Sequence, residues 1–280
     1  MKRVRAREVD SPDASLCAAR SSALPPQPWQ VSPSRSRETA TMRARRTSPC
    51  SAQPRSSRRL RTPQEPTAVR LPIPRDDQYF YTRTYIARTP RKGGRTRTWT
   101  DESWMSVDGS KPSRLKQEYG KVHHDPPLSK HEVRWPPTVY AKLKKLPTDP
   151  DKLLETLRHG QKSTPQTDRD AFFDACLLMQ GPRVMPPGLQ AAAFGALAGI
   201  PRVRVDRDEV DILGRRGIGV SYPGIDFTFL FDRDTYVYLG MRLKGSTVKL
   251  VHGHWQETNP YFETKGLQQI AVVDRVGQRP

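Results

Sequence analysis

Period-two runs of aromatic and β-branched residues stand at both ends of residues 75–280, and three helical segments stand between them. Residues of these types suit a pleated, half-buried surface, so each run predicts a β-strand. Because the strands come in two blocks and do not alternate with helices, the order indicates an α+β fold with a largely antiparallel sheet. This part of the chain is long enough for a single well-formed core.

The first block of strands is predicted at residues 78–87 and 95–107, with a turn rich in Pro and Gly between them. Asp108-Gly109 then offers a hairpin turn into a third strand, which completes a meander. A proline-rich loop without a clear period follows, and Trp135 is its expected anchor on the core. The later strands are expected in "PRVRVD", "GIGVSY", "IDFTFLF", "TYVYLGMRL", "TVKLVHGHW" and "LQQIAVVD".

Three helices are predicted between the two blocks of strands. In the first, Asp149 suits the N-cap, Pro150 the first helical position and Gly160 the exit. In the second, Thr167 and Asp170 have the spacing of a capping box. The third is the Ala-rich segment "PPGLQAAAFGALAGIP". Apolar residues in the first two helices share one face, so we expect these helices to pack against the sheet.

Residues 1–74 differ from the rest of the chain in composition. The first seventy residues carry fifteen Lys and Arg against five Asp and Glu, about half of the net charge of +19, and one aromatic residue. This composition predicts a disordered segment, because it buries too little apolar surface to offset chain entropy. Three interpretations stay open: a basic arm that binds nucleic acid, a tail without a dedicated partner, or the product of a wrong start or reading frame.

The cysteines and histidines do not indicate a disulfide framework or a metal site. Cys17 and Cys50 lie in the first segment, and Cys176 lies in the apolar run "AFFDACLLM", where it is expected to be a small buried residue. His252 and His254 share one face of a strand, but a zinc site normally needs a third protein ligand, and none is evident. We therefore predict no bound metal.

Two acidic pairs are the remaining candidates for catalysis. Asp232 and Asp234 stand between two runs with a period of two, which predicts a hairpin loop and not a catalytic pair. Asp101 and Glu102 are adjacent on a strand, so they point to opposite faces and are expected to be solvated. The sequence therefore predicts a protein that is not an enzyme and has no cofactor.

The strands contain more aromatic residues than one face of a small sheet usually needs. Packing against the three helices is one interpretation of these side chains. The other is an apolar groove on the sheet that binds a lipid, another hydrophobic ligand or a segment of a partner. The candidate ligand-binding residues are Tyr81, Trp99, Trp104, Phe229 and Tyr238.

Four segments, "WMSVDGSKPSR", "LPTDPDKLL", "FDRDTYVYLG" and "AVVDRVGQRP", resemble a family of uncharacterised actinobacterial cell-envelope proteins. The resemblance covers roughly residues 75–280, and the terminal D-R-x-G-Q-x-P is its most specific element. It implies a domain outside the membrane that follows a cytoplasmic N-terminus and one transmembrane helix. The order of elements is similar to LolA/RseB-type half-barrels, which bind lipid moieties or sense envelope state beside anti-sigma factors.

The resemblance implies a curved, half-barrel-like sheet packed against about three helices. The chain departs from the family because no run of 18 apolar residues is present where a transmembrane helix is expected, and "MKRVRAREVD" is not followed by an apolar region. We predict a non-enzymatic, extracytoplasmic domain that binds a hydrophobic ligand or an envelope or regulatory protein partner. The alternative is a nucleic-acid-binding protein, whose salt-dependent binding would require residues 1–70.

Overall fold

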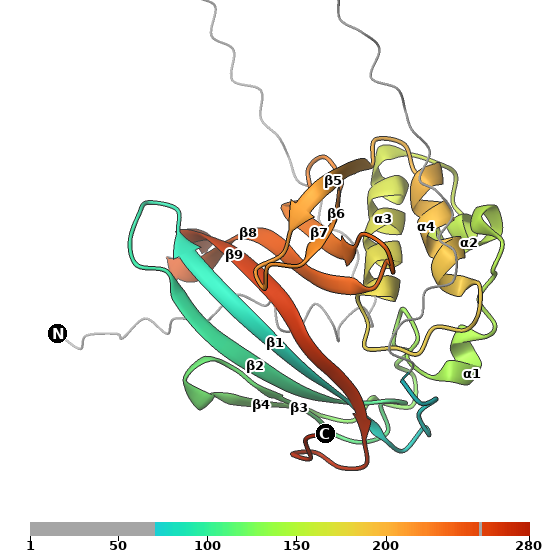
Figure 1. Ribbon diagram of the computed structural model, residues 1–280, viewed down its shortest axis with the longest axis horizontal. Helices are drawn as coiled ribbons and strands as arrows, with labels where there is room; N and C mark the ends of the chain where they lie inside the picture. Colours follow the sequence, from blue (N-terminus) through green and yellow to red (C-terminus); the bar gives the residue numbers. More distant parts are fainter. Residues whose placement is uncertain (1–70, 252–253) are drawn as a thin grey trace, which may run out of the picture. The chain divides into compact units, whose positions relative to one another are not determined.

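The computed structural model describes residues 71–251 and 254–280 of the chain. These residues belong to one compact unit, which holds a nine-stranded antiparallel sheet with helices packed against it (Figure 1). The predicted α+β fold is confirmed. Residues 1–70 lie outside the described residues, so the disordered segment expected over residues 1–74 and the domain boundary at residue 75 stay predictions.

The order of strands across the sheet is β4-β3-β2-β1-β9-β8-β7-β6-β5. The last strand therefore pairs with the first, and β9 joins the two blocks of strands into one sheet. The strands are β1 (Tyr79–Pro90), β2 (Arg97–Ser106), β3 (Ser113–Lys116), β4 (Val122–Asp125), β5 (Arg204–Val210), β6 (Arg216–Ser221), β7 (Phe227–Asp232), β8 (Tyr238–Val251) and β9 (His254–Val273).

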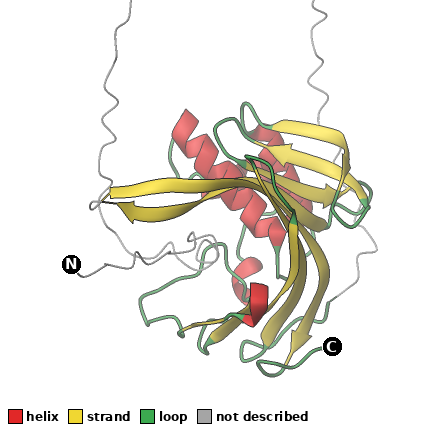
Figure 2. Cartoon of the chain, turned by 90° about the vertical axis from the view of Figure 1, so that its left-hand side faces the viewer, coloured by secondary structure: helices red, strands yellow, loops and turns green. Residues whose placement is uncertain are grey.

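Helices lie on the side towards which the sheet bends, as Figure 2 shows. The three longer helices, α2–α4, are the three that the sequence predicts, and the expected curved sheet packed against about three helices is confirmed. The helical segments are η2 (Glu118–Gly120, 3-10), α1 (Tyr140–Leu143), α2 (Pro150–Leu157), α3 (Pro165–Gln180) and α4 (Leu189–Gly199).

The helix starts follow their capping residues, with one correction. The Asp149 side chain accepts a hydrogen bond from the backbone N–H of Lys152, as expected for the N-cap of α2. The N-cap of α3 is Thr164, which exchanges side-chain and backbone hydrogen bonds with Thr167. The expected cap at Thr167 is therefore wrong by one turn. The helix begins earlier in the chain, at Pro165, because proline is suited to the first helical position.

The main core lies between α2–α4 and strands β6–β8. Cys176 is fully buried there, as predicted, and burial raises the pKa of its thiol well above the usual value. Trp135 packs against this core, and its indole N–H donates to Asp174 Oδ2 at 2.8 Å, so the expected loop anchor is confirmed. We call the sheet face that carries Met241 and Leu243 of β8 the helix-side face, because both belong to this core.

Two elements differ from the sequence prediction. The proline-rich loop contains a short edge strand, β4, which pairs with β3 and has no periodic signal of its own. The segment "TVKLVHGHW" was expected as one strand, but β8 ends in it at Val251 and β9 begins in it at His254. β9 is also much longer than "LQQIAVVD". Asn259 and Pro260 argue against a strand, and β9 tolerates them beside the register shift between Gly245 and Thr247 of β8.

Candidate ligand-binding face of the sheet

The helices cover only part of the helix-side face. Among the described residues, the core beneath α2–α4 includes buried side chains of β6–β9 but none of β1–β3. The register places a group of partly exposed side chains on the helix-side face of β1, β2, β3 and β9. We call this group the half-covered face: Thr82, Thr84, Asp101, Ser103, Leu115, Leu267 and Ile270.

A buried charged group lies beside the half-covered face. Glu263 of β9 is only 2% exposed and accepts a hydrogen bond from Arg88 Nε at 2.6 Å, while Lys265 Nζ lies 3.2 Å from its other oxygen. The Arg88 guanidinium also lies 4.1 Å from the ring centroid of Tyr261 and 5.2 Å from that of Trp99. Each charge in this group therefore has a partner, as buried charges require.

Asp101 is the exception on this face. Register pairs Asp101 with Thr84, and Lys265 of β9 provides the largest compensating charge. The Trp99 indole N–H donates to the carboxylate, but Oδ1 is buried without a hydrogen-bond partner. Burial raises the pKa of Asp101 from its usual 3.8 to about 6, although Lys265 and the Trp99 hydrogen bond oppose the change.

His123 of β4 has a second unpartnered atom on the same face. Ser103 pairs with Leu115 and Leu115 with His123, so the three side chains lie in one row across the sheet. His123 Nε2 is buried and has no hydrogen-bond partner. Buried polar atoms are almost always paired in native proteins, so these two atoms mark a face whose polar groups the protein leaves incompletely compensated. The third such atom among the described residues, Arg114 Nε, lies on the outer face beside Trp104.

Tyr81 and Trp104 lie on the opposite, outer face of β1 and β2. Their ring centroids are 5.4 Å apart, and Trp104 is 2% exposed. The C-terminal residues cover them: the Trp104 indole N–H donates to the carbonyl of Gln278, and Arg279 Nε and Nη2 donate to the two oxygens of Glu102 at 2.6 and 2.7 Å. The Tyr81 hydroxyl donates to Glu102 as well.

The five candidate residues from the sequence do not form one cluster. Phe229 and Tyr238 belong to the core beneath the helices, and Tyr81 and Trp104 belong to a separate cluster on the outer face. Trp99 alone is next to the half-covered face, as the hydrogen-bonding partner of Asp101. A ligand-binding role for the five stays a prediction.

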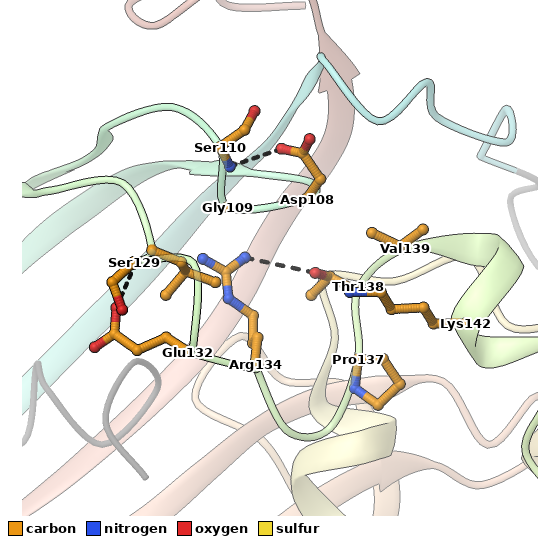
Figure 3. A pocket seen from close by; sticks show the side chains of 11 residues that line it. Asp108, Gly109, Ser110, Ser129, Glu132, Arg134, Pro137, Thr138, Val139 and Lys142 are labelled. Atoms are coloured by element: carbon orange, nitrogen blue, oxygen red, sulfur yellow. Dashed lines mark hydrogen bonds between the residues drawn. The ribbon is translucent and has the colours of Figure 1, made fainter. Parts of the chain in front are cut away.

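A small polar cavity lies between the β2–β3 turn, the loop before α1 and α1 itself (Figure 3). Its volume is about 200 Å³, below the roughly 300–1,000 Å³ of typical ligand pockets. Arg134 donates to the carbonyl of Ser106 at 2.7 Å, and Asp108 accepts from the N–H of Ser110. Glu132 accepts from the N–H of Ser129. These polar groups already form hydrogen bonds that hold the turn and the loop in place, so this cavity is a weaker candidate for ligand binding.

The Asp232–Asp234 segment forms a turn, as predicted. Asp232 Oδ1 accepts hydrogen bonds from the N–H groups of Asp234 and Thr235 and from the Thr235 hydroxyl. Burial opposes the ionised form of Asp232, but these hydrogen bonds outweigh it and lower the pKa. The loop is longer than expected, because Tyr236 adopts a left-handed conformation and β8 begins only at Tyr238. A cavity of about 270 Å³ beside this loop is lined by Val205, Arg207, Ile218, Arg233 and Tyr236.

Two further expectations concern metals and membranes. Within residues 71–251 and 254–280, no group of three or more His, Cys, Asp or Glu side chains is arranged to hold a metal ion. His252 lies outside the described residues, so the His252–His254 pair stays untested. No helix in the described part of the chain has the length and apolarity to cross a membrane.

Sequence reasoning missed Asp101 as a site residue, since both Asp101 and Glu102 were expected to be solvated. That expectation is wrong: Glu102 is buried under Arg279, and Asp101 is largely desolvated. A signal was present in "WTDESW", because Trp99 shares a face with Asp101 and Trp104 shares the other with Glu102. A strand with a tryptophan on each face is covered on both sides, and so are the acidic residues between them.

Comparisons with known proteins add little to this geometry. No family model matches the chain, and no curated protein matches it. Among solved structures, a LolA superfamily protein from Nitrosomonas europaea is similar at 7% identity and a TM-score of 0.21, over 74% of this chain and 90% of that one. A putative outer membrane lipoprotein-sorting protein domain from Vibrio parahaemolyticus is similar at 8% identity and a TM-score of 0.19, over 72% and 88%.

Proposed function

We propose that the domain over residues 75–280 is a binding module, not an enzyme, and that it takes a hydrophobic ligand on the half-covered face. The observation that carries the proposal is the combination on that face of partly exposed apolar side chains with buried polar atoms that lack partners. Ligand sites typically pair an apolar lining with a few polar groups that orient the ligand. Leu115, Leu267 and Ile270 supply the first component, and Asp101 and His123 supply the second.

The resemblance of the four sequence segments supports an extracytoplasmic, cell-envelope location for this binding, with an envelope or regulatory protein as a further partner. In this proposal Tyr81, Trp104, Phe229 and Tyr238 act by holding the sheet in shape, and Trp99 borders the ligand. The nucleic-acid alternative depends on residues 1–70, which lie outside the described residues.

The proposal is tested with the neutral hydrophobic dye Nile red and the purified full chain. Leu115→Glu and Ile270→Glu each place a charge among the apolar side chains of the half-covered face. Both should weaken dye binding by about tenfold or more, because a charge in an apolar contact costs several times the thermal energy. Leu250→Glu is the matched control, since Leu250 is 51% exposed on the β8–β9 hairpin.

Circular dichroism establishes that each variant is folded before its dye binding is compared. Binding that is retained in both Leu115→Glu and Ile270→Glu, or lost equally in Leu250→Glu, would show that the half-covered face is not the binding site. No dye binding by the native chain would refute the proposed function itself.

A further inference from the structure

The half-covered face has a hydrogen-bond acceptor that the protein does not use. Asp101 Oδ1 is buried without a partner, whereas the neighbouring Glu263 has Arg88 on one oxygen and Lys265 on the other. No ion pair involves Asp101 among the residues that the structure describes, and Lys265 is held 3.2 Å from Glu263. A desolvated carboxylate in this state is stabilised by any cation that reaches it.

The surroundings of Asp101 limit what that cation is attached to. Along β1 and β9 its neighbours on the same face are Thr84 and Leu267, and Trp99 lies next to it on β2. Leu115 and Ile270 continue the same face with apolar surface. A fully hydrated inorganic cation gains nothing from such side chains, whereas an organic ammonium buries its apolar part against them.

We propose that the ligand of the half-covered face is an amphiphile with a protonated primary amine, and that this amine pairs with the carboxylate of Asp101, a partly exposed residue on that face. The inference rests on the proposed function and names its ligand class. An anionic head group is disfavoured, because the cations nearby are already paired with carboxylates: Arg88 and Lys265 with Glu263, and Arg97 with Glu118. A neutral alcohol also donates a hydrogen bond, but it leaves the carboxylate charge uncompensated.

The positive charge of the whole chain disfavours the binding of amines, so a preference for an amine would show a local interaction. The net charge is +19, so the average electrostatic field repels cations. A preference for an amine over an alcohol of the same chain length must therefore come from a local carboxylate.

Amine binding should also depend on pH. Asp101 has a pKa of about 6 in the folded chain, so it becomes protonated and neutral as the pH falls from 7 to 5. A primary amine keeps its proton over this range, as lysine does. The charged groups that act on Asp101 are Lys265 and Glu263 on β9 and Glu118 in η2, with Arg88 paired to Glu263 and Arg97 to Glu118. His123 of β4 is a further titratable group on the same face. Dependence on Asp101 itself is isolated with Asp101→Asn.

The test compares decylamine, decanol and decanoate as competitors of Nile red on the full chain. For the native chain at pH 7, decylamine should compete at least about tenfold better than decanol, the usual scale of a charge-assisted hydrogen bond. Decanoate should compete worst. In Asp101→Asn, which keeps the shape of the side chain, the ratio of the decanol to the decylamine inhibition constant should fall to about one; the dye affinity of the variant is measured separately, so this ratio does not depend on it. The advantage should also shrink in the native chain at pH 5.

Asp226→Asn is the control, because Asp226 is an exposed carboxylate 3.9 Å from Lys244, outside the half-covered face; it should keep the native preference. Equal competition by decylamine and decanol would overturn the amine inference and leave the proposed function standing. A preference that persists in Asp101→Asn would overturn it as well, because the acceptor would be elsewhere. Failure of Nile red and all three competitors to bind would remove the proposed function and this inference together.

Discussion

Asp101 and Glu102 are neighbours on β2 that lie on opposite faces of the sheet and have opposite pKa shifts. Hydrogen bonds from Arg279 lower the pKa of Glu102 despite its burial, and Tyr81 adds another. Asp101 is desolvated without an equivalent partner, so its pKa is raised. Of these two carboxylates, that of Asp101 has no ion pair among the described residues and gains most from an added cation.

This difference predicts that Asp101→Asn stabilises the chain in the absence of ligand. Since the folded-state pKa of Asp101 is about 6 and the usual value is 3.8, its ionisation disfavours folding increasingly as pH rises through this window. At pH 7 the variant should be more stable by on the order of 2 kcal/mol. The gain should shrink as the pH falls towards 4. Urea denaturation across this range measures it, with Asp226→Asn as the control; a gain that does not change with pH would mean that Asp101 ionises normally.

The alternation of a strand predicts which side chains share a face but not what covers that face. For β2 the covering groups are Arg279, from the end of the chain, and Lys265, from β9. Both are distant in sequence from residues 101 and 102, so no local pattern connects them. The solvated state expected for the acidic pair was wrong for this reason.

At the scale of elements, the C-terminal segment after β9 covers the outer face of β1 and β2. Its motif D-R-x-G-Q-x-P has a structural basis: Asp274 accepts a hydrogen bond from Gln78, and Gly277 adopts a positive φ of 86° that favours glycine. Gln278 and Arg279 bind Trp104 and Glu102, respectively. The sequence resemblance singles out this motif, and the structure assigns it to closing one face of the sheet.

We expect Arg279→Ala to loosen this segment, because it leaves the buried Glu102 carboxylate without its main partner. The melting temperature should fall, and the indole N–H of Trp104 should exchange faster with solvent. Arg275→Ala is the matched control, since Arg275 belongs to the same segment and is exposed; it should change neither property. Unchanged Trp104 exchange in Arg279→Ala would mean that the segment is held by other contacts.

At the scale of the whole described domain, periodicity and capping residues were sufficient to predict the order of strands, helices and strands. They were not sufficient to predict that β9 pairs with β1, which creates the half-covered face between the two blocks. That pairing joins Thr84 to Leu267 and Thr82 to Ile270, contacts that depend on the fold as a whole. The candidate site is therefore formed by the pairing of strands that are far apart in the sequence. The aromatic content of the strands instead predicted Tyr81, Trp104, Phe229 and Tyr238 as site residues.

The central claim, that the helix-side face of β1–β3 and β9 binds the ligand, is tested most directly by photolabelling. A decylamine derivative with a diazirine on its alkyl chain is irradiated with the full chain, and labelled peptides are identified by mass spectrometry. We predict labels on the peptides that contain Leu115 and Leu267–Ile270, and their loss when excess decylamine is added. Saturable labelling confined instead to Trp104 and the C-terminal segment, or to the core residues Phe229 and Tyr238, would contradict the account.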